Sequence, residues 1–134
     1  MNTPVKFEIA KLLKEKGFDN ESAHYYNEKG EMLFDAYYPS LQPTKPDVYY
    51  DNPTIAEVIM WLYEKHGIWI AVDWMTRTKP YKSGFYSNLR GTTKPLNQDN
   101  FISINNTKSP GYEVFNSPTE AYEAAIFYVL SNLI

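Results

Sequence analysis

Apolar residues recur at helical spacing in three parts of the chain, which predicts helices over residues 3–17, 52–67 and 117–134. Gly17 and Gly67 follow the first two patterns, as expected of residues that end a helix. A capping residue followed by proline begins each pattern, because proline lacks the N–H that has no partner in a first helical turn. The predicted starts are Thr3-Pro4, Asn52-Pro53 and Ser117-Pro118.

Aromatic and alternating stretches predict the strands. Residues 23–27 and 31–38 flank Gly30 and have the pattern of a hairpin, in which Met32, Phe34 and Ala36 are expected to face the core. The clearest alternation is IWIAVDWM at residues 68–75. Its predicted buried face consists of Ile68, Ile70, Val72 and Trp74, and Trp69 points to the exposed side. Further strands are predicted at residues 81–89, 101–104 and 112–115.

Residues 39–53 contain four prolines and end near Tyr49-Tyr50. This composition excludes a helix or a central strand and predicts an extended Pro/Tyr loop. The pieces on either side of the loop are too small for separate cores, so we expect a single globular domain over residues 1–134. The predicted fold class is α+β, with three helices and a mostly antiparallel sheet of four to five strands, in the order α-β-β-(long loop)-α-β-β-β-α.

Three stretches of the chain together resemble a known family. They are residues 12–34 (LLKEKGFDNESAHYYNEKGEMLF), 48–72 (VYYDNPTIAEVIMWLYEKHGIWIAV) and 115–134 (FNSPTEAYEAAIFYVLSNLI). The family consists of small uncharacterised proteins encoded by phages, prophages and mobile elements of gut-type anaerobic bacteria. The resemblance implies a cytoplasmic accessory protein, and it transfers no catalytic or binding residue. Family members have acidic, Trp-rich strands where this chain is basic, so the type of partner does not transfer either.

Composition and charge exclude several classes of site. The chain has no cysteine, which excludes disulfides and thiolate metal sites. No apolar run is long enough for a membrane helix, no secretory signal pattern is found, and neither a cofactor nor a metal site is predicted. The net charge is −3, but no acidic residue falls between Asp73 and Asp99. The basic residues in that interval are Arg77, Lys79, Lys82, Arg90 and Lys94.

Aromatic residues make up 16% of the chain, and they suggest the first functional hypothesis. Exposed rings are effective interface anchors because they bury much area at a small cost in side-chain entropy. We therefore predict a non-enzymatic protein–protein interaction module, whose partner is an unidentified host or phage protein. A homodimer through an exposed strand edge is also possible. The candidate contact residues are Tyr37, Tyr38, Tyr49, Tyr50 and Trp69.

The basic stretch at residues 77–94 suggests an alternative, a nucleic-acid-binding accessory protein. In such a site aromatic rings stack on bases while lysine and arginine contact the phosphates. Its candidate residues are Arg77, Lys79, Lys82, Tyr86, Arg90 and Lys94. A third hypothesis is an enzyme that uses Asp35 and Asp73, each of which interrupts an apolar strand. Alternation favours the polar face of the sheet for both carboxylates, and no constellation typical of catalysis supports this hypothesis.

Overall fold

The computed structural model describes residues 3–22, 24–34, 47–106 and 114–134. These residues form an α+β fold, as the sequence predicts, with the following helices and strands. They are α1 (Phe7–Glu15), β1 (His24–Asn27), β2 (Met32–Phe34), β3 (Tyr49–Asp51), α2 (Ile55–His66), β4 (Ile68–Met75), β5 (Gly84–Gly91), β6 (Ile102–Ile104) and α3 (Pro118–Asn132).

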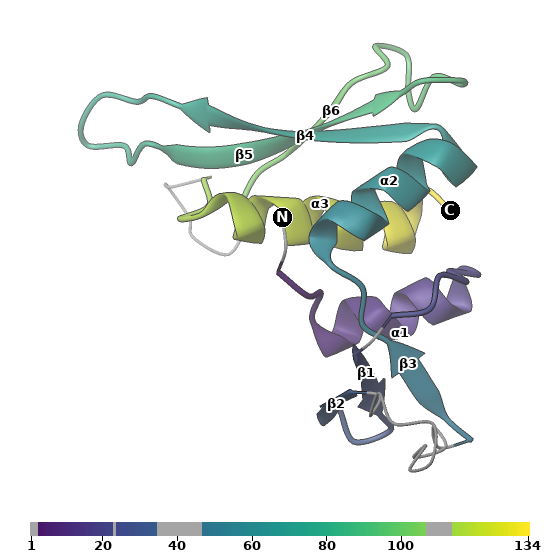
Figure 1. The fold of residues 1–134 in the computed structure, drawn as a ribbon. Coiled ribbons are helices and arrows are strands. Elements are labelled where there is room, and N and C mark those ends of the chain that lie inside the picture. Colours follow the sequence, from purple (N-terminus) through teal and green to yellow (C-terminus); the bar gives the residue numbers. More distant parts are fainter. Residues whose placement is uncertain (1–2, 23, 35–46, 107–113) are drawn as a thin grey trace.

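The helices lie between two sheets. Figure 1 shows the sheet of β4, β5 and β6 lying across α2 and α3, with α1 below them and the small sheet of β1, β2 and β3 at the opposite end. Side chains of the large sheet and of the helices meet in a common core. Its fully buried members include Leu13, Leu62, Ile70, Leu89 and Ile126. The other face of the large sheet carries no helix in the part of the chain that the structure describes.

The two sheets correct the prediction of a single sheet with four to five strands. Both sheets are antiparallel, as predicted, and their orders are β2-β1-β3 and β4-β5-β6. Strand β3 forms inside the predicted Pro/Tyr loop, because Tyr50 pairs with Tyr26 of β1. Residues 39–46 of that loop lie outside the described residues. The helix layer occupies the space between the sheets, and it therefore prevents the small strands from joining the large sheet.

Helices α1 and α2 begin later than the sequence predicts. The N-cap of α1 is Lys6, because Pro4 forms a β-bridge with Thr54 and the Val5 amide donates a hydrogen bond of 2.9 Å to the Pro53 carbonyl. For α2 the N-cap is Thr54 instead of Asn52, and the Thr54 side chain accepts from the Glu57 amide. The short pairing between the segments that precede α1 and α2 thus replaces the first helical turn that was predicted to begin at each proline.

The predicted start of α3 at Ser117 is confirmed. Ser117 caps α3 through a hydrogen bond from the Glu120 amide, and the Glu120 carboxylate accepts from the Asn116 amide. Phe18 folds back after α1, where its amide donates to the Leu13 carbonyl and its ring is buried. In the described segments, no helix is both long and apolar enough to cross a lipid bilayer.

Two apolar side chains that the alternation placed in the core are exposed instead. Met32 on β2 is 49% exposed, and Trp74 on β4 is 55% exposed. Trp74 does share its sheet face with the buried Ile70, as predicted. Trp74 is the second-last residue of β4, next to the loop that leads to β5, and its ring remains largely in solvent there.

Strand boundaries also shift in the second half of the chain. The strand predicted at residues 81–89 runs from Gly84 to Gly91, because residues 76–83 form the loop between β4 and β5. The short strand predicted at residues 112–115 is reduced, within the described part, to a single bridge between Phe115 and Phe85.

Candidate functional site

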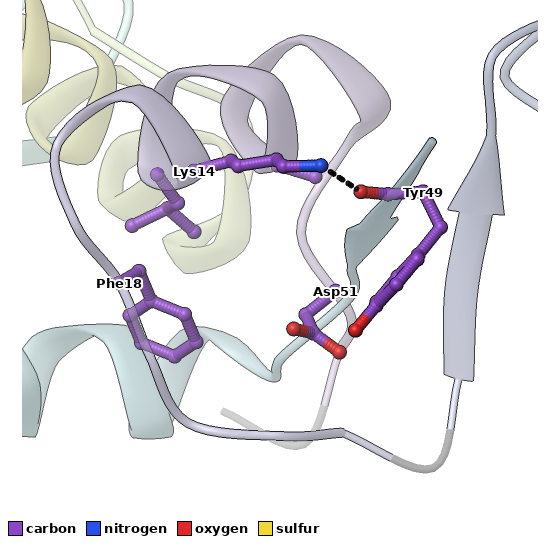
Figure 2. A pocket seen from close by; sticks show the side chains of 6 residues that line it. Lys14, Phe18, Tyr49 and Asp51 are labelled. Atoms are coloured by element: carbon purple, nitrogen blue, oxygen red, sulfur yellow. Dashed lines mark hydrogen bonds between the residues drawn. The ribbon is translucent and has the colours of Figure 1, made fainter. Parts of the chain in front are cut away.

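One shallow pocket lies between α1 and β3 (Figure 2). Its floor is apolar and its rim is polar, with a volume of about 160 Å³. This is below the roughly 300–1,000 Å³ that is usual for pockets that hold a small ligand. The lining residues are Ala10, Leu13, Lys14, Phe18, Tyr49 and Asp51.

The polar groups of this pocket already have partners within the protein. The Lys14 ammonium donates a hydrogen bond of 2.7 Å to the Tyr49 carbonyl (Figure 2). It also lies over the Tyr49 and Tyr50 rings. The Asp51 carboxylate accepts from the amide and the hydroxyl of Ser22, both at 3.4 Å. The Lys14 contacts join α1 to the small sheet, and the Asp51 contacts join β3 to the segment before β1, so we assign both a structural role.

The carboxylates and imidazoles that the structure describes form no metal-binding cluster. No group of three or more His, Asp or Glu side chains within them is arranged to hold a metal ion. Asp73 lies on the polar face of the sheet, as expected, and accepts a hydrogen bond of 2.6 Å from Asn88. Asp35 lies outside the described residues.

Burial shifts the pKa of two other side chains. It raises the pKa of Tyr26, whose hydroxyl donates a hydrogen bond of 2.8 Å to the Val5 carbonyl. It lowers the pKa of His66 at the end of α2. Both residues contact the core, and neither lies at a cleft.

A second candidate site is the tip of the β4–β5 hairpin, which we call the hairpin end and define as residues 74–85. Figure 1 shows that this segment reaches past the helices. The Ser83 hydroxyl bridges the two sides of its loop, since it accepts from the Arg77 amide at 2.8 Å and donates to the Arg77 carbonyl. A turn closed by the Tyr81 amide and the Thr78 carbonyl completes the loop.

Aromatic rings and basic groups alternate over the hairpin end. The Trp74 ring packs edge-on against Phe85 with centroids 5.0 Å apart, and its indole N–H donates to Thr76. The Arg77 guanidinium lies 4.6 Å from the centre of the Tyr81 ring. Tyr81 is 52% exposed, which makes it, with Trp74, one of the two most exposed large rings that the structure describes. The hairpin end therefore presents two exposed rings, of which Tyr81 lies beside a cation.

Lys79 and Lys82 are the other cations of the hairpin end, and both are exposed. Lys82 donates a hydrogen bond to the Asn116 side chain, which anchors the loop to the start of α3. The interval without acidic residues that the sequence shows after Asp73 thus becomes a positively charged loop on a rigid hairpin.

The structure divides the predicted basic set into two groups. Arg90 pairs across the strands with Trp69, at the far end of β5 from the hairpin loop, and its guanidinium lies over the Phe101 ring. Lys94 follows in the next loop. The pairs Trp69–Arg90 and Trp74–Phe85 are separated by about 17 Å of strand. Only Arg77, Lys79 and Lys82 therefore belong to the hairpin end; Tyr86 lies between the two groups and is half-buried.

The predicted protein-binding residues do not form one surface. Tyr49 and Tyr50 are half-buried: Tyr50 packs against Phe7 and Tyr49 against Tyr25. Trp69 is 40% exposed, as predicted, but it belongs to the large sheet at the opposite end of the molecule. Tyr37 and Tyr38 lie outside the described residues.

Two residues of the hairpin end were not among the predicted site residues, namely Trp74 and Tyr81. Alternation assigned Trp74 to the core, and Tyr81 was placed inside a strand. Their position next to Arg77 and Lys82 in the sequence was the available indication, because exposed rings between basic residues are typical of nucleic-acid-binding surfaces.

Comparisons with known proteins add no identification. The chain matches no protein-family model, no curated protein and no solved structure. The resemblance to a phage-encoded family therefore stays a prediction.

Proposed function

We propose that the protein is a non-enzymatic binding protein that holds single-stranded nucleic acid at the hairpin end. The observation that carries the proposal is the placement of two exposed rings, Trp74 and Tyr81, among Arg77, Lys79 and Lys82 on a projecting, internally braced loop. This proposal adopts the second of the three functional hypotheses from the sequence, with Trp74 and Tyr81 as its rings in place of Tyr86.

The chemistry of the hairpin end favours unpaired bases. Every base has a flat face that stacks on an aromatic ring, and neighbouring lysine and arginine side chains neutralise the phosphates. Bases in a duplex are already stacked on one another, so exposed rings distinguish single strands from duplexes. Because the whole protein carries a net charge of −3, a polyanion is repelled by much of the surface and directed to the loop.

The packing of the tyrosines is the reason for preferring this ligand to a protein partner. Tyr49 and Tyr50 contribute to the contact between α1 and the small sheet, which leaves Trp69 as the exposed ring among the described residues of the predicted protein-binding set. A nucleic-acid ligand is compatible with a cytoplasmic, phage-type accessory protein, and both attributes remain predictions.

The proposal is tested by fluorescence anisotropy with a labelled oligothymidine of about 20 nucleotides, long enough for the usual site sizes. Substitution of Trp74→Ala or Tyr81→Ala is expected to weaken binding about ten-fold, since stacking of one base on a ring contributes roughly 1–3 kcal/mol. Charge reversal at Lys79 should also weaken binding. Duplex DNA of the same length should bind more weakly than the single strand.

Matched controls are available elsewhere on the surface. Trp69→Ala removes an exposed indole from the other end of β4, and Lys65→Glu reverses an exposed charge on α2. Both controls should keep the affinity of the unmodified protein, and thermal denaturation should show that every variant is folded. Absence of binding at low salt, or equal affinity for the hairpin variants and the controls, would refute the proposal and favour a protein partner.

A further inference from the structure

We infer that the protein forms a homodimer through the unpaired edge of β4, where two copies join their large sheets into one continuous antiparallel sheet. This inference rests on observations other than those for the proposed nucleic-acid ligand, and the two share Trp74, which lies both at the hairpin end and beside the edge of β4. It rests on the edge itself, on the side chains beside it and on the way the strand matches its own copy.

Strand β4 is an edge strand of eight residues. It pairs with β5 in an unbroken register from Ile68–Gly91 to Met75–Gly84. On its other side, no backbone hydrogen bond is found to any part of the chain that the structure describes. Alternate N–H and C=O groups along this side are therefore available to another strand.

The edge lacks the features that usually prevent strand pairing. Proteins protect exposed edges with proline, lysine, bulges or very short strands. The sequence IWIAVDWM contains no proline and no basic residue, and its regular register leaves no bulge. Its one charge, Asp73, is already hydrogen-bonded to Asn88. By contrast, the opposite edge strand β6 has three residues.

Apolar side chains accompany the edge on both faces of the sheet. On the helix side Val72 is half-buried and Trp74 is 55% exposed. Trp69, which alternates to the other face, contacts Tyr63 of α2 with ring centroids 5.6 Å apart, and Tyr63 is 44% exposed. A strand that pairs with β4 must place apolar groups beside these side chains, and β4 of a second copy carries such groups on both faces.

Pleating restricts the registers of such a dimer. In an antiparallel pair, two directly opposed residues have their side chains on the same face of the sheet. The two-fold axis of the dimer must therefore pass through one residue position, which is then opposite its own copy. An axis between two consecutive positions would oppose residues from different faces. Axes through Ala71 or Val72 pair all but one residue of the strand. Both axes place Trp74 beside an isoleucine of the other copy on the helix side, Ile68 or Ile70 respectively. Neither axis places Asp73 opposite its own counterpart.

The first test is the molar mass in solution, measured by sedimentation equilibrium over a wide concentration range. The unmodified protein is expected to dimerise, and Ala71→Glu is expected to be a monomer. The new carboxylate would face its own copy in one register and Asp73 in the other, so it repels in both. The matched control is Ser103→Glu, on the same face but on β6, which should still dimerise.

The second test captures the dimer with a disulfide and introduces no charge. It therefore tests the inference even if Ala71→Glu fails to fold. The chain has no cysteine, so a single introduced thiol crosslinks only to its copy. Opposed residues in antiparallel strands have Cα atoms about 4.5–5.5 Å apart, which suits a disulfide. Under mild oxidation, Ala71→Cys or Val72→Cys should give a covalent dimer, whichever lies on the axis, and Ser103→Cys should not.

Three results would overturn the inference. The first is a monomer at all accessible concentrations. The second is a dimer that is crosslinked neither by Ala71→Cys nor by Val72→Cys. The third is a dimer that Phe127→Glu dissociates and Ala71→Glu leaves intact. Phe127 is an exposed ring on α3, so this result would place the interface on that helix.

Discussion

At His66, two effects on the imidazole oppose each other. The residue ends α2, where the partial negative charge of the helix terminus favours the protonated ring. Its Nε2 atom is buried without a hydrogen-bond partner in the described residues, and its ring packs edge-on against Trp61. Burial dominates and lowers the pKa of His66, so the neutral ring is the form that suits the fold.

This shift predicts a loss of stability in acid. Below the ordinary histidine pKa of 6.5, the unfolded chain binds a proton at His66 and the folded chain resists it. The free energy of unfolding should therefore fall as the pH decreases from about 6.5 toward the lowered pKa of the folded state. Urea unfolding near pH 7.5 and pH 5.5 measures the loss, which should be smaller in His66→Gln. An equal loss in both proteins would contradict this prediction.

At the scale of secondary structure, glycines after α1 and α2 allow the chain to leave a helix. Gly17 has a φ of 85° and Gly67 a φ of 65°, in the left-handed region that other residues rarely adopt. Their surroundings differ. No atom lies within 4 Å of a Cβ added at Gly17, whereas a Cβ at Gly67 would clash with the Thr93 hydroxyl. Gly67 is also tied to the next loop, because its carbonyl accepts from the Thr92 amide at 2.7 Å.

The two glycines therefore form a matched pair for mutation. Gly17→Ala should lower the free energy of unfolding by about 1 kcal/mol, the cost of a left-handed alanine. Gly67→Ala has the same conformational cost, and its new methyl group must also displace Thr93. The free energy of unfolding should therefore fall by roughly 2–4 kcal/mol in this variant. Denaturant unfolding measures both values. Equal losses would mean that the loop after β5 adjusts without cost.

On the scale of the whole molecule, the charge of the hairpin end is opposite in sign to the net charge of the protein. The protein carries a net charge of −3, yet the hairpin end carries Arg77, Lys79 and Lys82 without an acidic residue between them. The proposed ligand therefore contacts a small cationic site on an anionic protein. Binding should depend on few phosphate contacts, and on salt to a corresponding degree.

The dependence on salt follows from the number of cations at the hairpin end. About three phosphate contacts to a single strand give a slope near −2 for the logarithm of the binding constant against the logarithm of salt concentration. The affinity for oligothymidine should thus fall roughly fifteen-fold from 50 to 200 mM salt. A slope steeper than about −3 would contradict this and add Arg90 and Lys94 to the contact surface.

Much of the fold could be predicted from local sequence because the relevant contacts are local. The cap at Ser117 and the helix end at Gly17 depend on neighbours within a few residues. The alternation of β4 correctly identified the buried Ile70 and the exposed Trp69. The candidate site was less predictable. The basic residues form one continuous stretch in the sequence, but in the structure β5 separates them into groups at its two ends.

By itself, the sequence determined the α+β class, the three helices, the faces of β4 and the cationic interval after Asp73, because periodicity, capping and charge are properties of neighbouring residues. Only the tertiary structure decided what covers each face. The helix layer separates the strands into two sheets, leaves Trp74 exposed, and takes Tyr49 and Tyr50 into its own packing. A periodic pattern identifies an apolar face, but the extent of the opposing element determines whether that face is buried or remains available for binding.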